Sequence, residues 1–220
     1  RPSVSRPGGT SAADREQDAL DRQTSVVYLD NMPRGMAGEF VERKARLDQR
    51  GQRFVPHIVA IGIGGTVDFP NSDPFFHNVF SLSPGQRFDL GQYKSGEIKT
   101  RLFREPGPVE VYCNIHPQMI GFVMVVDSAF AAITGTDGSF RFENVPPGSH
   151  TLKAWQEDGT EVSQPIVVKS GAEPPLTIQI DVSGAARALA QAAARVGAGA
   201  CVEGIRAEDC LATQVRRQQD

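Results

Sequence analysis

The sequence predicts an all-β protein, made of a Greek-key β-sandwich, a smaller antiparallel β unit and a short C-terminal helix. Short runs rich in β-branched and aromatic residues recur, with turn residues about every eight to twelve positions. The 22 glycines and 15 prolines supply those turns. With 40% hydrophobic residues in 220, the chain can bury a substantial core. A helical apolar period is evident only near the C-terminal end.

Net charge and hydropathy exclude two classes of protein. The formal charge of −3 is not the strong basic excess of a nucleic-acid-binding protein. No apolar run reaches the roughly 18 residues that a membrane-spanning helix needs. The chain begins at Arg1 without an initiator Met or a signal peptide. We therefore expect a processed form, for which the missing signal says little about export.

The N-terminal part is polar before the first strand. Residues 1–24 are rich in Ser, Gly and Pro and are expected to form a flexible leader. Residues 25–30, "SVVYLD", form a short β-type run, which we assign to a first domain spanning 25–127. Residues 31–53 are highly charged, which favours a solvated loop and leaves open a docking surface for an acidic partner.

The remainder of the first domain has the pattern of a sandwich. "FVPHIVAIGIGGTVDF" holds two β-branched runs separated by Gly64 and Gly65. "GPVEVYC" alternates, which places Cys113 on the same face as two valines and Tyr112 on the other. Residues 121–127, "GFVMVVD", are almost continuously apolar, as expected of a strand deep in the sandwich.

Residues 128–182 are predicted to form a second, smaller β domain. "TDGSFRFENVPPGSHTLKAW" alternates polar and apolar residues around a Pro-Pro-Gly turn. From Ser183 the apolar period becomes helical, so 183–220 is predicted to be a helical tail. Cys201 and Cys210 lie in this tail and could form a disulfide in an oxidising compartment; the alternative is two free thiols.

Four side chains suggest a metal centre. A thiolate, two imidazoles and a weak thioether form the ligand set of electron-transfer copper sites. A C-x2-H-x2-M stretch follows a predicted strand, and a further histidine lies upstream in "HNVFS". The candidate ligands are His77, Cys113, His116 and Met119.

These stretches resemble the cupredoxins, the small blue copper proteins of the plastocyanin and amicyanin kind. The matching pieces are "FPNSDPFFHNVFS" and "VYCNIHPQM", and the resemblance covers roughly residues 40–127. It implies one mononuclear type 1 copper ion and one-electron transfer between a donor and an acceptor redox protein, with no enzymatic reaction. It also implies an exported, periplasmic location.

The resemblance assigns further roles around the ligands. Asn78 resembles the residue that clamps the two ligand segments by hydrogen bonds, and Asn114 could serve likewise. Pro117 would stiffen the loop or simply form its turn. Phe75 and Phe76 could form an apolar rim where electrons leave, or could be ordinary core residues. Tyr112 could lie on a second route for electrons, or it could be an ordinary tyrosine that faces outward from its strand.

The same residues allow other interpretations. Each ligand alone could be structural: a histidine capping a turn, a buried thiol, a methionine filling space. A binuclear copper centre would need a second cysteine in the loop, and zinc prefers stronger donors than a thioether.

The remaining histidines lack the paired spacing of multicopper oxidases. We expect His57 to be a satisfied strand-edge residue and His150 to face solvent.

The second block resembles the carboxypeptidase regulatory-like, transthyretin-type β-sandwich repeats, on the residues "TDGSFRFENVPPGSHTLKAW". That resemblance implies a scaffold for docking onto something larger. An alternative function follows: an accessory or structural subunit of a membrane-bound electron-transfer complex, with copper bound or lost. Copper storage would call for Met or His clusters, which the sequence lacks.

Overall fold

The computed structural model describes residues 24–30 and 42–169 as strands and turns. The predicted all-β sandwich is confirmed within these ranges. None of these residues lies in a helix, so the described part has no helix able to span a membrane. Residues 1–23 of the predicted leader, residues 170–182 of the predicted second domain, the helical tail and the Cys201–Cys210 pair lie outside the described residues.

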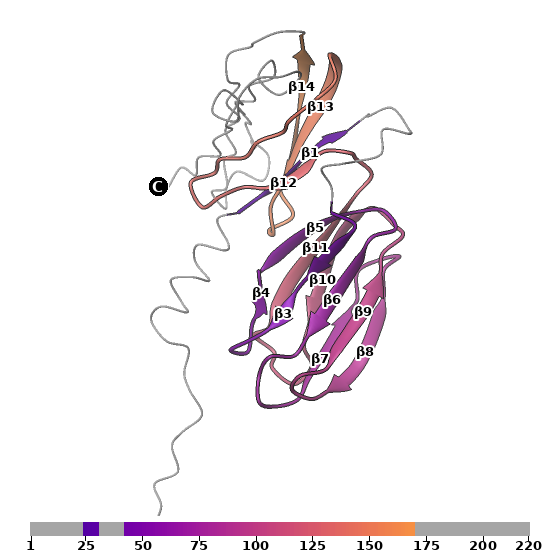
Figure 1. The fold of residues 1–220 in the computed structure, drawn as a ribbon, viewed down its shortest axis with the longest axis vertical. Helices are drawn as coiled ribbons and strands as arrows, with labels where there is room; N and C mark the ends of the chain where they lie inside the picture. The colour runs from indigo at the N-terminus through magenta and orange to yellow at the C-terminus, as the bar shows by residue number, and fades with distance from the viewer. Residues whose placement is uncertain (1–23, 31–41, 170–220) are drawn as a thin grey trace, which may run out of the picture.

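The first unit has two facing sheets (Figure 1). The larger sheet has five strands, of which only the β5–β11 pair is parallel. Its order is β5 (Ile58–Gly62), β11 (Ile120–Val126), β10 (Gly107–Tyr112), β7 (His77–Ser81) and β8 (Phe88–Tyr93). The smaller sheet has the order β2 (Lys44–Arg46), β6 (Thr66–Pro70) and β9 (Ile98–Leu102). A short hairpin of β3 (Asp48–Gln49) and β4 (Phe54–Val55) completes the unit.

The core lies between these sheets because apolar residues alternate along their strands. Phe69 of β6 and Val79 of β7 have no exposed surface, and both belong to the same cluster. Strand β11 is buried along nearly its whole length, as its continuous apolar run predicts. Cys113 and Met119 belong to this cluster too, so two of the four candidate ligands are packed into the core.

The sheet of the second unit includes β1, a strand that was predicted to belong to the first domain. Its order is β12 (Ala131–Ile133), β1 (Val26–Asp30), β13 (Gly148–Trp155) and β14 (Glu161–Val168). Strand β1 lies between β12 and β13, so the boundary at residue 25 needs correction. Alternation buries Val27 and Leu29 of β1 in the core of the second unit. These pairings join residues more than 100 positions apart, which no local pattern reveals.

A third apolar cluster joins the two units. It contains Phe122 of β11 and Trp155 of β13, whose ring centroids lie 5.6 Å apart in an edge-on arrangement. Beside this cluster, His57 Nε2 lies 2.5 Å from Glu157 Oε2. His57 therefore has a hydrogen-bond partner, as predicted, and this partner belongs to the second unit. The prediction that His150 faces solvent is wrong. His150 is buried, and its Nε2 donates a hydrogen bond to the Pro146 carbonyl at 2.8 Å.

Candidate metal centre

Three candidate ligands converge on one point in the first unit. Cys113 Sγ lies 3.7 Å from His77 Nδ1 and 3.8 Å from His116 Nδ1, and the two Nδ1 atoms are 3.0 Å apart. Among the described residues this is the group of three metal-binding side chains whose ligand atoms all lie within 4.8 Å of one another. Cys113 and His77 are buried, whereas His116 is half-buried.

The local fold explains how these side chains meet. His77 begins β7, and Cys113 directly follows the end of β10. Strands β7 and β10 are antiparallel neighbours, which brings the start of one beside the end of the other. His116 lies in the loop between β10 and β11, and this loop is tightened by a hydrogen bond from the Met119 N–H to the His116 carbonyl at 2.9 Å.

The three atoms are close enough to bind a single ion. Metal–nitrogen and metal–sulfur bonds of about 2.0–2.3 Å allow two ligands of one ion to lie up to about 4.6 Å apart. The separations of 3.0, 3.7 and 3.8 Å fall within this limit. One thiolate with two imidazoles suits copper, and the geometry of this donor set therefore fits the metal that the sequence suggests.

Met119, the fourth candidate, is placed less directly. Its side chain is 1% exposed and belongs to the same core cluster as Cys113. The structure therefore buries the thioether in the cluster that also contains the Cys113 thiol. An axial role for this sulfur remains a prediction.

Hydrogen bonds favour the thiolate form of Cys113. Burial raises the pKa of this thiol, but the bond from His77 and main-chain N–H groups of the two ligand segments lower the pKa to about 6. Burial lowers the pKa of His77, and this effect is outweighed by the contacts with Cys113 and Asp73, which raise that pKa. A thiolate, the form that binds metals, is thus available at neutral pH.

Asn78 links the two ligand segments. Its Oδ1 accepts the Asn114 N–H at 3.4 Å, and its Nδ2 donates to Asp89 Oδ1 at 2.6 Å. Asn78 is 1% exposed, whereas the Asn114 side chain is exposed and contributes through its main chain. Pro117 lies in the exposed turn after His116.

An aromatic side chain packs against His116, and further apolar residues next to the ligands in the sequence are exposed. The Phe75 ring centroid lies 5.2 Å from that of His77 and 5.3 Å from that of His116. Phe75, Phe76 and Ile115 are 37%, 55% and 37% exposed, so they lie at the surface and are not core residues. We call these three residues the apolar rim.

The hydrogen bond and the ring contact of Tyr112 are with residues outside the apolar rim. Its side chain is half-buried, and its hydroxyl donates to the Glu110 carboxylate. Its ring centroid is 5.7 Å from that of Phe80, its cross-strand partner. The hydrogen bond to Glu110, with partial burial and the negative charge of that carboxylate, raises the pKa of Tyr112 to about 12.

Asp73 also belongs to the site, although no sequence pattern predicted it. Asp73 is buried, and its Oδ2 lies 2.7 Å from His77 Nε2. A carboxylate on the far nitrogen of a metal-binding histidine orients the ring and strengthens the ligand. The available signal was an aspartate four positions before the histidine in "SDPFFH", but loop geometry was needed to bring the two together.

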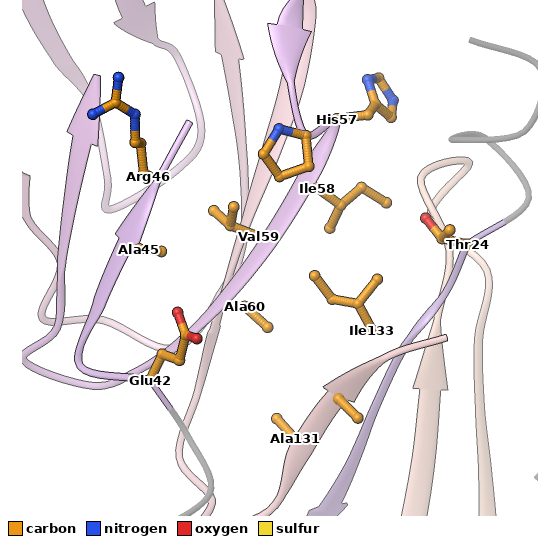
Figure 2. A pocket seen from close by; sticks show the side chains of 12 residues that line it. Thr24, Glu42, Ala45, Arg46, His57, Ile58, Val59, Ala60, Ala131 and Ile133 are labelled. Atoms are coloured by element: carbon orange, nitrogen blue, oxygen red, sulfur yellow. The ribbon is translucent and has the colours of Figure 1, made fainter. Parts of the chain in front are cut away.

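A hollow of about 450 Å³ lies at the junction of the two units, outside the metal centre (Figure 2). The apolar side chains of Ile58, Ala60 and Ile133 line it. Two of its polar lining residues are already paired, Arg46 with Asp48 and His57 with Glu157. We assign no function to this hollow.

Comparison with protein-family models finds no match, and comparison with curated proteins finds none either. Similar solved structures include a Cu-containing nitrite reductase (NirK) from Thermus scotoductus SA-01 and a purple cupredoxin from Nitrosopumilus maritimus, each with 26% identity. A mutant of amicyanin, in its reduced Cu(I) form at pH 4, is 20% identical. The TM-scores are 0.36, 0.35 and 0.36, too low to carry a functional conclusion.

The similar regions cover 38%, 37% and 46% of this chain, respectively. They cover 22% of the nitrite reductase chain, 99% of the purple cupredoxin and 98% of the amicyanin. The chain thus spans less than a quarter of the nitrite reductase. More than half of this chain lies outside each of the similar regions.

Proposed function

We propose that the first unit is a cupredoxin that binds one mononuclear type 1 copper ion and transfers single electrons between redox proteins. The convergence of Cys113 Sγ with the Nδ1 atoms of His77 and His116 is the observation that carries this proposal. Met119 is the proposed axial ligand. A copper ion held there would supply a Cu(I)/Cu(II) couple.

The protein's part is to hold the ligands still. Two of the three ligands are buried in or beside the sandwich core, and both ligand segments are tied together through Asn78. A rigid ligand set changes little between the two charge states, so each transfer needs little rearrangement. The buried position of Cys113 keeps water from the thiolate, which also protects it from oxidation.

We propose that redox partners dock at the apolar rim. His116 is the only one of the three converging ligands with appreciable exposure, and Phe75 packs against its ring. A small apolar face of this kind suits brief contacts with small buried areas, below about 1,200 Å². The proposed location is the periplasm.

Copper loading with visible spectroscopy tests the proposal. The purified protein is titrated with Cu(II), and the expected result is an intense thiolate-to-copper charge-transfer band that saturates at one ion per chain. The Cys113→Ser variant should lose the band while keeping the fold by circular dichroism. Met119→Leu should keep the band and change its energy, because the thioether is only a weak axial ligand.

A colourless protein after copper loading and oxidation would contradict the proposal. It would favour the alternative of an accessory subunit of a membrane-bound electron-transfer complex. A band that survives in Cys113→Ser would show that copper binds elsewhere. Size-exclusion chromatography of a native extract, followed by detection of this chain, separates a free carrier from a subunit.

A further inference from the structure

We propose that Asp73, held by the Gly51–Gln52 turn, is the positioning residue that fixes His77 for metal binding. We propose also that this turn, through the Gln52 side chain, holds the loop between His116 and Met119 in position. The inference rests on the proposed function for its metal, but its first test uses the metal-free protein.

Three N–H groups converge on the Asp73 carboxylate. Oδ1 accepts the Gly51 N–H at 2.7 Å, and Oδ2 accepts the Gln52 N–H at 2.9 Å. Oδ2 also lies 2.7 Å from His77 Nε2. Since main-chain N–H groups only donate, both oxygens must accept, and an ionised carboxylate is the side chain that does so.

This arrangement selects one tautomer of His77. A carboxylate has no proton to offer, so His77 Nε2 must be the donor and carries the hydrogen. Nδ1 is then the nitrogen left for the metal, and it is Nδ1 that lies 3.7 Å from Cys113 Sγ and 3.0 Å from His116 Nδ1. In the metal-free protein Nδ1 can hold a second proton directed at the Cys113 thiolate, which a metal ion would displace. Asp73 thereby presents the nitrogen that binds the metal.

The turn that holds Asp73 has an unusual backbone. Gly51 and Gln52 have φ values of 63° and 57°, both in the left-handed region, at the tip of the β3–β4 hairpin. Positive φ at both central residues is typical of a two-residue hairpin turn. Glycine adopts it freely, whereas a glutamine there is uncommon. The conformation directs both N–H groups at Asp73.

The Gln52 side chain gives this residue a second contact. Its Oε1 accepts a hydrogen bond from Gln118 Nε2 at 2.9 Å. Gln118 lies in the loop between His116 and Met119. One hairpin tip therefore contacts both ligand-bearing segments, the first through Asp73 and the second through Gln118.

The main chain around Asp73 is fixed as well. The Asp73 N–H donates to Asn71 Oδ1 at 3.0 Å. Asn71 is 1% exposed, and its Nδ2 donates to the carbonyls of Phe75 at 2.8 Å and Tyr93 at 3.1 Å. The loop leading to His77 is therefore anchored to β8 independently of any metal.

The first test measures the tautomer of His77 in the metal-free protein by ¹⁵N NMR of the imidazole nitrogens. In the wild type Nε2 should stay protonated as Nδ1 loses its proton with rising pH, so the neutral ring should be the Nε2–H tautomer only. Asp73→Ala should give mixed tautomers, and Asp73→Asn should lie between them, since an amide oxygen can still accept one bond. The control is Asp68→Asn on β6, which loses a carboxylate paired with Lys44 and should leave His77 unchanged.

The second test measures copper binding with competing chelators. Asp73→Ala should weaken copper affinity by about 10–100-fold, the usual effect of losing such a partner. Gln52→Ala and Gln118→Ala should each speed copper dissociation several-fold. The double variant should be no faster than either single one, because both substitutions remove the same bond.

The outcomes separate the two proposals. A single Nε2–H tautomer retained in a folded Asp73→Ala would overturn the positioning role. Additive effects of the two glutamine variants, or none, would overturn the link between the loops. Should Asp73→Ala not fold, the glutamine pair still decides that link, and Asp73→Asn decides the tautomer. A wild type that binds no copper but shows the Asp73-dependent tautomer would support the positioning and refute the proposed function.

Discussion

The Nδ1 atoms of His77 and His116 lie 3.0 Å apart, and Cys113 Sγ lies within 3.8 Å of both. Two imidazole lone pairs and a thiolate at these distances repel one another unless a proton or a cation lies between them. A proton on His77 Nδ1, directed at the Cys113 thiolate, relieves part of this repulsion in the metal-free protein, and a metal ion in its place would relieve it for all three atoms.

Copper should therefore stabilise the fold. A ligand that binds only the folded state adds about 2.7 kcal/mol at a concentration 100 times its Kd. We expect a higher melting temperature in scanning calorimetry after copper loading. The variant His116→Ala, which keeps the buried pair His77 and Cys113, should show a much smaller increase. An equal increase in both proteins would mean that the ion binds elsewhere.

Asn78 should matter through its side chain and Asn114 through its backbone only. Asn78→Ala removes the acceptor of the Asn114 N–H and one of the donors to Asp89 Oδ1, which also accepts the Gly91 N–H; the loss of these two bonds should cost about 1–3 kcal/mol in the free energy of unfolding. Asn114→Ala keeps the N–H donor, so it should change stability little. Urea denaturation of both variants checks this, and equal losses would show that the Asn114 side chain contributes.

Cys113 should ionise unusually early in the metal-free protein. Its pKa of about 6, against an ordinary 9.0, means that the thiolate forms as the pH rises through about 6 and is lost below it. The ultraviolet thiolate absorbance, taken as the difference between the wild type and Cys113→Ser, measures the titration. In His77→Ala the midpoint should move upward, because a bond that favours the thiolate is lost. A midpoint near 9 in the wild type would contradict the prediction.

The contact between Phe122 and Trp155 should couple the two units. Phe122→Ala removes a 3% exposed ring from the cluster between them, which should cost about 3–5 kcal/mol. Trp155 is the single tryptophan of the chain, so its fluorescence reports on this junction. We expect its emission to shift to the red in the folded variant. The comparison is Phe140→Ala, which lies in the other core and should leave the emission nearly unchanged.

How far the sequence carries the fold can be judged from particular elements. The alternation of residues 107–113 and the apolar run 121–127 are local patterns, and both strands appear as β10 and β11. Residues 25–30 were predicted to form a strand of the first domain, and the structure pairs this strand, β1, with β12 and β13 of the second unit. Its partners are set by side chains that pack across the whole chain, and only the folded structure contains them.

At the metal centre, too, the sequence predicts some residues and leaves others to the tertiary structure. Spacing and donor type were enough to choose His77, Cys113 and His116, because metal chemistry restricts the usable side chains to a few residue types. The residue types of Asp73 and Gln52 do not point to a metal site, because aspartates and glutamines have many roles in proteins. Their roles arise from a hairpin tip that the tertiary fold places beside two loops. The sequence by itself determined which atoms can bind an ion, and the tertiary structure alone decided what holds them in position, because support depends on distance in space and not on order along the chain.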